Sequence, residues 1–98
     1  MSTYTVHWLA RAVADRDAIV SYIAAELFNP PAAIQFGDEV EKNVDLISAT
    51  GVAYRRGKVA GTRECVITPT YVLVYRFKAV QKRIEILRIL QTRRRKTG

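Results

Sequence analysis

Residues 63–96 decide the fold, and they read RECVITPTYVLVYRFKAVQKRIEILRILQTRRRK. Apolar segments separated by short turns predict three successive β-strands, at residues 62–67, 71–77 and 83–90. The YVLVY run is almost continuously apolar, which is typical of a central strand covered on both faces. The stretch ends in a run of four cations at residues 93–96, so a basic segment directly follows the last predicted strand.

The preceding half of the chain predicts one strand and two helices. Alternating apolar residues favour a strand over residues 4–9, and helical spacing follows from Arg11 onward. The first helix must end before Pro30, whereas Asn29 is a good N-cap for a second helix with a proline at its first position. The apolar stripe of this second helix consists of Ala33, Phe36, Val40, Val44 and Ile47. The short connection makes the two helices an antiparallel hairpin.

Residues 48–62 contain three glycines and three cations and show no clear periodicity, which predicts a mobile basic loop. The predicted order is therefore β-α-α-β-β-β. We expect a small α+β domain in which a helical hairpin covers one face of a twisted, mainly antiparallel sheet.

Charge is distributed unevenly along the chain. Residues 1–49 contain three Lys or Arg against seven Asp or Glu, a net charge of −4, and residues 50–98 contain thirteen against two, a net charge of +11. The cationic surface therefore belongs to the strand half. This pattern favours a negatively charged partner, either nucleic acid or an acidic protein segment.

Length and composition predict a single domain over residues 1–98. The single cysteine, Cys65, is interpreted as a structural strand residue in a reducing compartment. No signal peptide pattern and no apolar run long enough to span a bilayer are found, so we expect a cytoplasmic protein that does not enter membranes. No metal site and no cofactor are expected, because the acidic residues lack ligand spacing with histidines and there is no phosphate-cradling glycine loop.

Five segments, in this order, resemble the ParE/RelE superfamily of bacterial type II toxins. They are Ile19–Ala24, Asn29-Pro30 with Ala32-Ala33, Gly61–Glu64, Tyr71–Arg76, and Ile86–Leu90 followed by Arg93-Arg94. The Arg-Glu pair before a strand and the Arg-Arg pair after the last strand are similar to the ParE branch, whose characterised members inhibit DNA gyrase. Members of the RelE branch instead cut messenger RNA on the ribosome.

The resemblance favours gyrase inhibition by binding. Cleavage of RNA needs a group that activates the 2′-hydroxyl and cations that hold the phosphate. Val72 stands where the RelE branch has its central-strand arginine, Cys65 stands where it has a strand lysine, and no tyrosine follows Tyr75. Ribosome-dependent RNA cleavage, with Arg63, Arg93 and Arg94 as its catalytic cations, stays an alternative. So does a diverged toxin that acts as a nucleic-acid-binding module.

The chain also departs from the ParE pattern. Arg16 lies between Asp15 and Asp17 where a leucine is usual, and Gln91 takes the place of a histidine that often precedes the arginine pair. At both positions, the role of the family residue does not transfer directly to the residue of this chain.

Two sets of cations are expected to bind partners. The residues predicted to contact the target are Arg63, Arg76, Arg88, Arg93 and Arg94. The resemblance implies a ParD-like antitoxin with an acidic C-terminal segment, and the residues predicted to bind that segment are Arg55, Arg56, Lys58 and Arg63. The apolar part of the antitoxin contact is expected on the exposed side of the helical hairpin and the adjoining sheet.

Other candidates have simpler structural interpretations. His7 is interpreted as an exposed or structural strand residue rather than a catalytic one. Tyr22, Ile23 and Phe36 are interpreted as core residues. Asp15 and Asp17 are interpreted as solvated residues of a helix surface.

Overall fold

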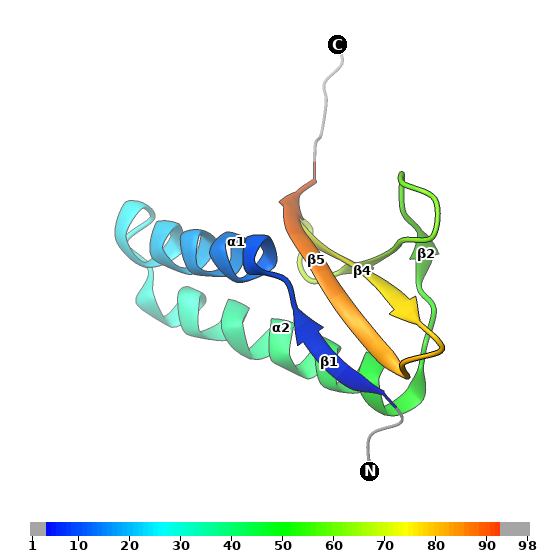
Figure 1. Cartoon of the computed structure of the whole chain (residues 1–98). Helices are drawn as coiled ribbons and strands as arrows, with labels where there is room; N and C mark the ends of the chain where they lie inside the picture. The colour runs from blue at the N-terminus through cyan, green and yellow to red at the C-terminus, as the bar shows by residue number, and fades with distance from the viewer. Residues whose placement is uncertain (1–3, 93–98) are drawn as a thin grey trace.

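The computed structural model of the chain describes residues 4–92 and consists of two helices packed on one five-stranded sheet (Figure 1). The elements follow one another as β1 (Thr5–Trp8), α1 (Ala10–Ser21), the π-helical turn η1 (Tyr22–Glu26), α2 (Pro30–Thr50), β2 (Arg55–Arg56), β3 (Arg63–Val66), β4 (Tyr71–Lys78) and β5 (Arg83–Gln91). This is the predicted α+β architecture with one additional short strand. No helix in this part of the chain is both long and apolar enough to cross a bilayer.

The sheet has the order β1-β5-β4-β3-β2. β4 is its middle strand, as the YVLVY run predicts, and it pairs antiparallel with both β3 and β5. β1 joins the far side of β5 in parallel, so the sheet is mainly antiparallel. A register shift between Val74 and Tyr75 marks a β-bulge in the β4–β5 ladder, which increases the local twist.

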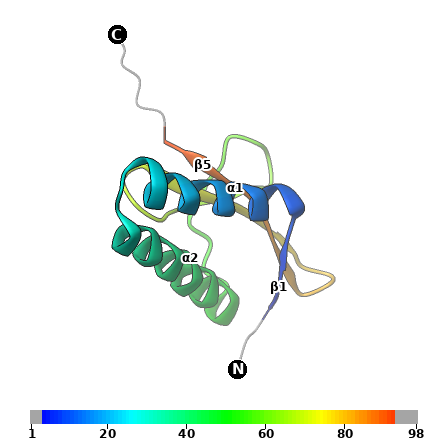
Figure 2. The ribbon, with the colours of Figure 1, turned by 90° about the vertical axis from the view of Figure 1, so that its left-hand side faces the viewer.

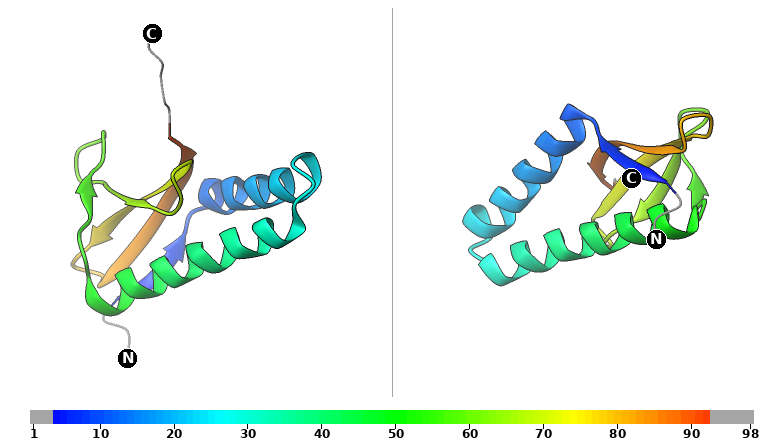
Figure 3. Two further views of the ribbon diagram at one scale, coloured as in Figure 1. Left: turned by 180° about the vertical axis from the view of Figure 1, so that it is seen from behind. Right: turned by 60° about the horizontal axis from the view of Figure 1, so that its bottom comes forward.

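The helices form an antiparallel hairpin on one face of the sheet (Figure 2). The Asn29 side chain accepts a hydrogen bond of 3.1 Å from the amide of Ala32, and proline occupies the start of α2, which confirms the predicted N-cap. α2 ends at Gly51, whose φ of 69° suits a residue without a Cβ. The helices lie close together at the hairpin tip and diverge toward β1 (Figure 3).

One hydrophobic core lies between the helices and the sheet. α2 contributes Phe36, Val40, Val44 and Ile47, and the strands contribute Leu73, Tyr75, Ile84 and Ile86. Since neighbouring residues of a strand point to opposite faces, Val72 and Val74 belong to the face that the helices leave open. The helices thus cover one face of β4 rather than both.

The prediction of one long loop over residues 48–62 is wrong in two places. α2 continues to Thr50, and Arg55 and Arg56 form the edge strand β2, paired with Glu64 and Arg63 of β3. Two polar residues carry no apolar alternation, so their pairing has no sequence signature. The predicted basic terminus at residues 93–96 lies outside the described residues.

Candidate functional site

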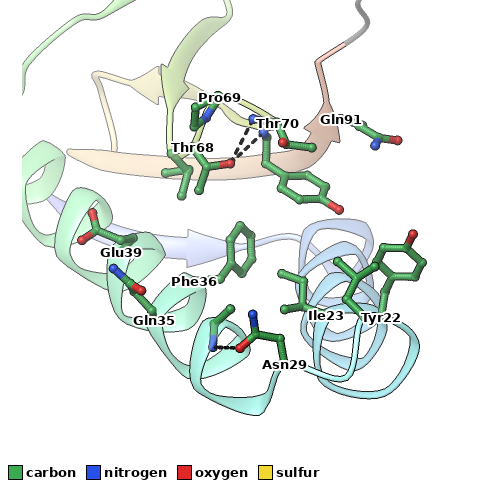
Figure 4. Close-up of a pocket in the computed structure, with 14 residues that line it drawn as sticks. Tyr22, Ile23, Asn29, Gln35, Phe36, Glu39, Thr68, Pro69, Thr70 and Gln91 are labelled. Carbon is green, nitrogen blue, oxygen red and sulfur yellow. Dashed lines mark hydrogen bonds between the residues drawn. The ribbon is translucent and has the colours of Figure 1, made fainter.

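A concave surface lies where the helical hairpin meets the β3–β4 turn, and we call it the hairpin groove (Figure 4). Its volume is about 660 Å³. Ile23, Phe36, Ile67 and Tyr71 form its apolar floor. The rings of Phe36 and Tyr71 meet edge to face with centroids 5.3 Å apart, a favourable aromatic geometry. The groove therefore offers a rigid apolar floor to a partner side chain.

Large apolar side chains are exposed around the same hairpin. Tyr22 is 48% exposed and Leu27 52% exposed, and both line the hairpin groove. Phe28 at the hairpin turn is 87% exposed, and Ile34 on α2 is 67% exposed. The interpretation of Tyr22 as a core residue is therefore wrong, whereas Phe36, which is 4% exposed, is confirmed as core.

The backbone at the hairpin tip departs from regular helix. The amide of Leu27 donates to the carbonyl of Tyr22 over 3.1 Å, which is the i→i+5 bond of a π-helical turn. Phe28 adopts a φ of 51°, a left-handed conformation that bulky residues rarely adopt. Such strain and π-helical turns concentrate at functional sites. The apolar pair Leu27-Phe28 just before Asn29-Pro30 was the sequence signal for this surface, since a solvated turn seldom carries two large apolar residues.

The β3–β4 turn forms the opposite wall of the groove, and hydrogen bonds between its own polar groups stabilise it. Thr68 Oγ1 accepts hydrogen bonds of 3.1 Å from the amides of Thr70 and Tyr71 (Figure 4). The Thr92 hydroxyl lies 2.8 Å from the Pro69 carbonyl. Burial, and to a lesser degree Tyr22, raises the pKa of Tyr71, so its phenol stays neutral at physiological pH.

Arg88, a predicted target-binding residue, is paired with α1. Its guanidinium donates two hydrogen bonds to Asp15, of 2.7 and 3.2 Å, and the amide of Ile89 donates a third of 2.9 Å. Burial works against ionisation of Asp15, but these hydrogen bonds outweigh it and hold its pKa below the ordinary value. The interpretation of Asp15 as a solvated residue is therefore wrong, because its carboxylate is hydrogen-bonded to Arg88 on β5. This partner lies 73 positions away in the sequence, so no local pattern indicates it.

Arg76 is also paired. Its guanidinium lies 2.8 Å from Glu85 on β5, and Arg83 lies 3.2 Å from the other oxygen of the same carboxylate. The hydrogen bond from Arg76 is the main cause of the lowered pKa of Glu85. One carboxylate thus neutralises part of the positive charge of this strand pair.

Arg63 does not share a surface with Arg76 and Arg88. Arg63 lies opposite Tyr75, which is fully buried on the helix-covered face of the sheet. Arg76 and Val74 flank Tyr75 on β4, so their side chains point to the other face. Arg88 pairs with Val74 and therefore belongs to that other face too. The half-buried Arg63 side chain donates to the carbonyl of Tyr54 over 3.1 Å. The three described arginines of the predicted target-binding set therefore do not lie on one face of the sheet.

The predicted antitoxin-binding cations differ in their surroundings. Arg55 forms an ion pair of 3.0 Å with Glu64 of β3. Arg56 and Lys58 are exposed or nearly so and have no carboxylate within 4.0 Å among residues 4–92. Arg93 and Arg94, which belong to the predicted target-binding set, lie outside the described residues.

The comparison with protein families decides the identity of the chain. The family model described as "ParE toxin of type II toxin-antitoxin system, parDE" matches residues 6–96. The chain belongs to the ParE toxin family. The comparison with curated protein sequences found no match.

Solved structures share the fold of this chain. The chain is similar to a protein of the chromosomal ParDE toxin–antitoxin system from P. aeruginosa, with 26% identity over 93% of this chain and 98% of the other and a TM-score of 0.79. It shares its fold with the RelBE toxin–antitoxin complex from Mycobacterium tuberculosis, with 23% identity, coverage of 94% of each chain and a TM-score of 0.63. It also shares it with a YoeB/ParE toxin from Agrobacterium tumefaciens, with 15% identity, coverage of 91% and 99% and a TM-score of 0.67.

The positions of this ParE-family chain that were compared with catalytic residues are Cys65, Val72 and His7. Cys65 is buried, and burial raises the pKa of its thiol, which makes it a poor nucleophile. Val72, at the position of the RelE-branch arginine, is buried and apolar. His7 is exposed on β1. Within residues 4–92, no group of three His, Cys, Asp or Glu side chains is placed to hold a metal ion.

Proposed function

We propose that this ParE-family toxin acts in the cytoplasm by binding and inhibiting DNA gyrase, without a cofactor and without turnover. The family match over residues 6–96 carries the proposal. The buried, apolar side chain of Val72 supports it, because a valine there cannot hold a scissile phosphate.

The test is gyrase supercoiling of relaxed plasmid beside in vitro translation, each with the purified protein. We expect supercoiling to stop while ribosome-bound messenger RNA stays intact. Codon-specific cleavage in the translation reaction with normal supercoiling would assign the chain to the RNA-cleaving alternative. Steeply salt-dependent DNA binding without any effect on gyrase would favour the nucleic-acid-binding module.

Target contact is proposed to involve the basic terminus. Replacing both Arg93 and Arg94 with alanine is expected to abolish growth inhibition and to leave the fold intact. A double variant that is as toxic as the wild type would remove these two residues from the target site.

The partner is proposed to be a ParD-like antitoxin whose acidic C-terminal segment orders on binding. Its apolar anchors would occupy the hairpin groove. Exposed apolar surface lies around the groove and comes from Tyr22, Leu27 and Phe28. Contact between apolar surface and water is unfavourable, so a patch of this kind indicates an interaction site. An amphipathic helix places side chains at i, i+3 and i+4 on one side, which suits a groove between two helices and a turn.

The acidic tail of the antitoxin would continue along β3. A second shallow groove lies between α2 and β3 and is lined by Asn43, Tyr54, Arg55, Glu64, Cys65 and Val66. Asn43 follows Glu39 of the hairpin groove by one helical turn, and its side chain donates to the Glu39 carbonyl over 2.8 Å. An extended segment along this path would reach the two unpaired cations, Arg56 and Lys58.

Binding kinetics separate the two parts of this contact. Truncating Tyr22 and Leu27 to alanine should speed dissociation of the cognate antitoxin, because apolar anchors mostly set the off-rate. Replacing Arg56 and Lys58 with alanine should instead slow association and flatten its salt dependence. An association rate of the wild type that does not respond to salt would exclude the basic residues from the antitoxin site. Unchanged dissociation of the Tyr22→Ala/Leu27→Ala variant would exclude the hairpin groove.

A further inference from the structure

A separate groove opens on the other side of the helices, between α1, α2 and β1, and we call it the β1 groove. Its volume is about 470 Å³, and none of its lining residues lines the hairpin groove. Val40 and Val44 of α2 are buried in its floor, with Val6, Trp8 and Val20 half-buried beside them. The divergence of the helices toward β1 produces this opening (Figure 3).

Carboxylates line one rim of the β1 groove. Asp38, Glu41 and Asp45 lie on α2 at spacings of three and four residues, so they share one side of the helix. All three are exposed, and none lies within 4.0 Å of a basic nitrogen of the described residues. The chain has a net charge of +7, but the surface at this rim is negatively charged.

The groove already holds one cation. The guanidinium carbon of Arg16 lies 4.7 Å from the centre of the Trp8 ring, which is the geometry of a cation–π contact. The tryptophan face and the acidic rim are therefore compatible with a guanidinium group. A partner cation would instead form ion pairs with Asp38, Glu41 and Asp45 on the rim.

β1 supplies backbone groups along the groove. It is an edge strand. The amide of Thr5 donates to the carbonyl of Lys82, just before β5, and the amide of Leu9 donates to the carbonyl of Ile86 on β5, both over 3.0 Å. Strand geometry then turns the backbone groups of Val6 and Trp8 outward, away from β5. Tyr4 is closed off, since its amide and carbonyl bond Ser48. Two residues of open strand edge thus lie beside an apolar floor.

We propose that the β1 groove binds an extended, cationic segment of a protein partner, which adds to the edge of β1 and alternates apolar with basic side chains. Backbone pairing with Val6 and Trp8 would give the segment its direction, the valine floor would accept alternate apolar side chains, and the carboxylate rim would select arginine or lysine. Like-charge repulsion disfavours an acidic antitoxin tail at this place. The surface is therefore distinct from both sites of the proposed function.

Trp8 gives a direct readout, because it is the single tryptophan of the chain and lines the groove. The probe is an acetylated and amidated octapeptide of alternating arginine and valine, titrated while Trp8 fluorescence is followed. We expect a saturable change with this peptide and none with the glutamate–valine counterpart. Methylating the peptide nitrogens of one alternate set should abolish binding, and methylating the other set should not, because only one set faces β1.

Two variants place the binding in the β1 groove. Glu41→Gln should weaken binding severalfold, whereas the matched Glu26→Gln variant, which removes the same charge outside both grooves, should bind as the wild type does. Gly37→Leu should block the groove, because nothing lies within 4 Å of a Cβ at Gly37 and the added side chain meets only the groove. Unchanged circular dichroism shows that each variant is folded.

Several results would overturn the proposal. Absence of a saturable signal, equal binding of the glutamate–valine peptide, or equal losses in the two charge variants would each exclude a cation-selective groove. Indifference to Gly37→Leu would place the peptide elsewhere. Sedimentation that shows self-association of the wild type, lost in Gly37→Leu, would assign the groove to a second copy of the chain. The gyrase and antitoxin assays are independent of these outcomes, because the β1 groove shares no lining residue with the hairpin groove.

Discussion

The cations of the β4–β5 pair and those in and just after β2 belong to the same basic half of the sequence, yet they have different surroundings. Arg76 and Arg88 are hydrogen-bonded to carboxylates of β5 and α1. Arg56 and Lys58 have no such partner among the described residues. A count of charges therefore overstates how many cations are available to a partner, because tertiary pairing has already used some of them to hold the fold together.

The difference also separates stability from recognition. A paired arginine that is removed leaves a partly buried carboxylate without its hydrogen bonds, which is costly. Removal of an exposed, unpaired cation changes the folded state little and mainly alters long-range attraction. We therefore expect substitutions at β4–β5 to affect the free energy of unfolding and substitutions in and just after β2 to affect association.

The largest effect is expected at Asp15. Asp15→Ala removes the hydrogen bonds to Arg88 and the one from the Ile89 amide, so the free energy of unfolding should fall by about 2–3 kcal/mol. Urea denaturation at neutral pH measures it. Asp17→Ala is the matched control, since Asp17 is mostly exposed and should change stability by less than about 0.5 kcal/mol. Equal effects of the two substitutions would contradict the structural role of Asp15.

The same site predicts a pH dependence. Because the folded pKa of Asp15 is lowered, its contribution is complete above its ordinary pKa of 3.8 and is lost as the pH falls through the folded value. The stability difference between the wild type and Asp15→Asn should therefore be constant near neutral pH and shrink at acidic pH. A difference that stays the same down to the acid-unfolding region would show that the charge of Asp15 contributes nothing.

The next effect concerns the segment before β2. The fully buried Tyr75 donates its hydroxyl proton to the Val52 carbonyl over 2.8 Å and accepts from the Tyr54 amide over 3.0 Å. Tyr75→Phe keeps the ring but leaves both backbone groups without this partner, so stability should fall by about 1–2 kcal/mol. Hydrogen exchange should be faster at Tyr54. Unchanged exchange there would mean that the hydroxyl does not hold the segment.

A smaller effect tests the pairing of Arg76 by titration. The hydrogen bond from Arg76 lowers the pKa of Glu85, so Arg76→Ala should raise that pKa toward its ordinary value. Carboxyl-carbon NMR measures the midpoint directly. Lys78→Ala, which removes a charge on the same strand without a hydrogen bond to Glu85, should move the midpoint less. The opposite ranking would show that the charge of nearby cations, and not the hydrogen bond from Arg76, sets the pKa of Glu85.

The smallest effect on stability is expected in and just after β2. The Arg56→Ala/Lys58→Ala variant should unfold within about 0.5 kcal/mol of the wild type in urea. A loss above about 1 kcal/mol would show that these cations have structural partners and would remove the contrast between the two regions.

Local patterns were enough to predict the helical hairpin and four strands, β1, β3, β4 and β5. Asn29-Pro30 fixes the start of α2 through short-range geometry, and the YVLVY run predicts the middle strand because burial requires apolar residues there. The hairpin groove was only partly predictable. Leu27-Phe28 was a visible signal, whereas no sequence pattern distinguishes the exposed Tyr22 from the buried apolar residues of the same helical stretch.

The sequence by itself determined the order of the main elements, the basic character of the strand half and the resemblance that membership of the ParE family confirms. Periodicity, capping and charge are local properties, so they can be read along the chain. Only the tertiary structure decided that Asp15 neutralises Arg88, that Arg63 and Arg76 lie on opposite faces, and that a groove opens beside β1. These features join residues far apart in sequence, and their partners are set by strand register and helix packing, which no local pattern encodes.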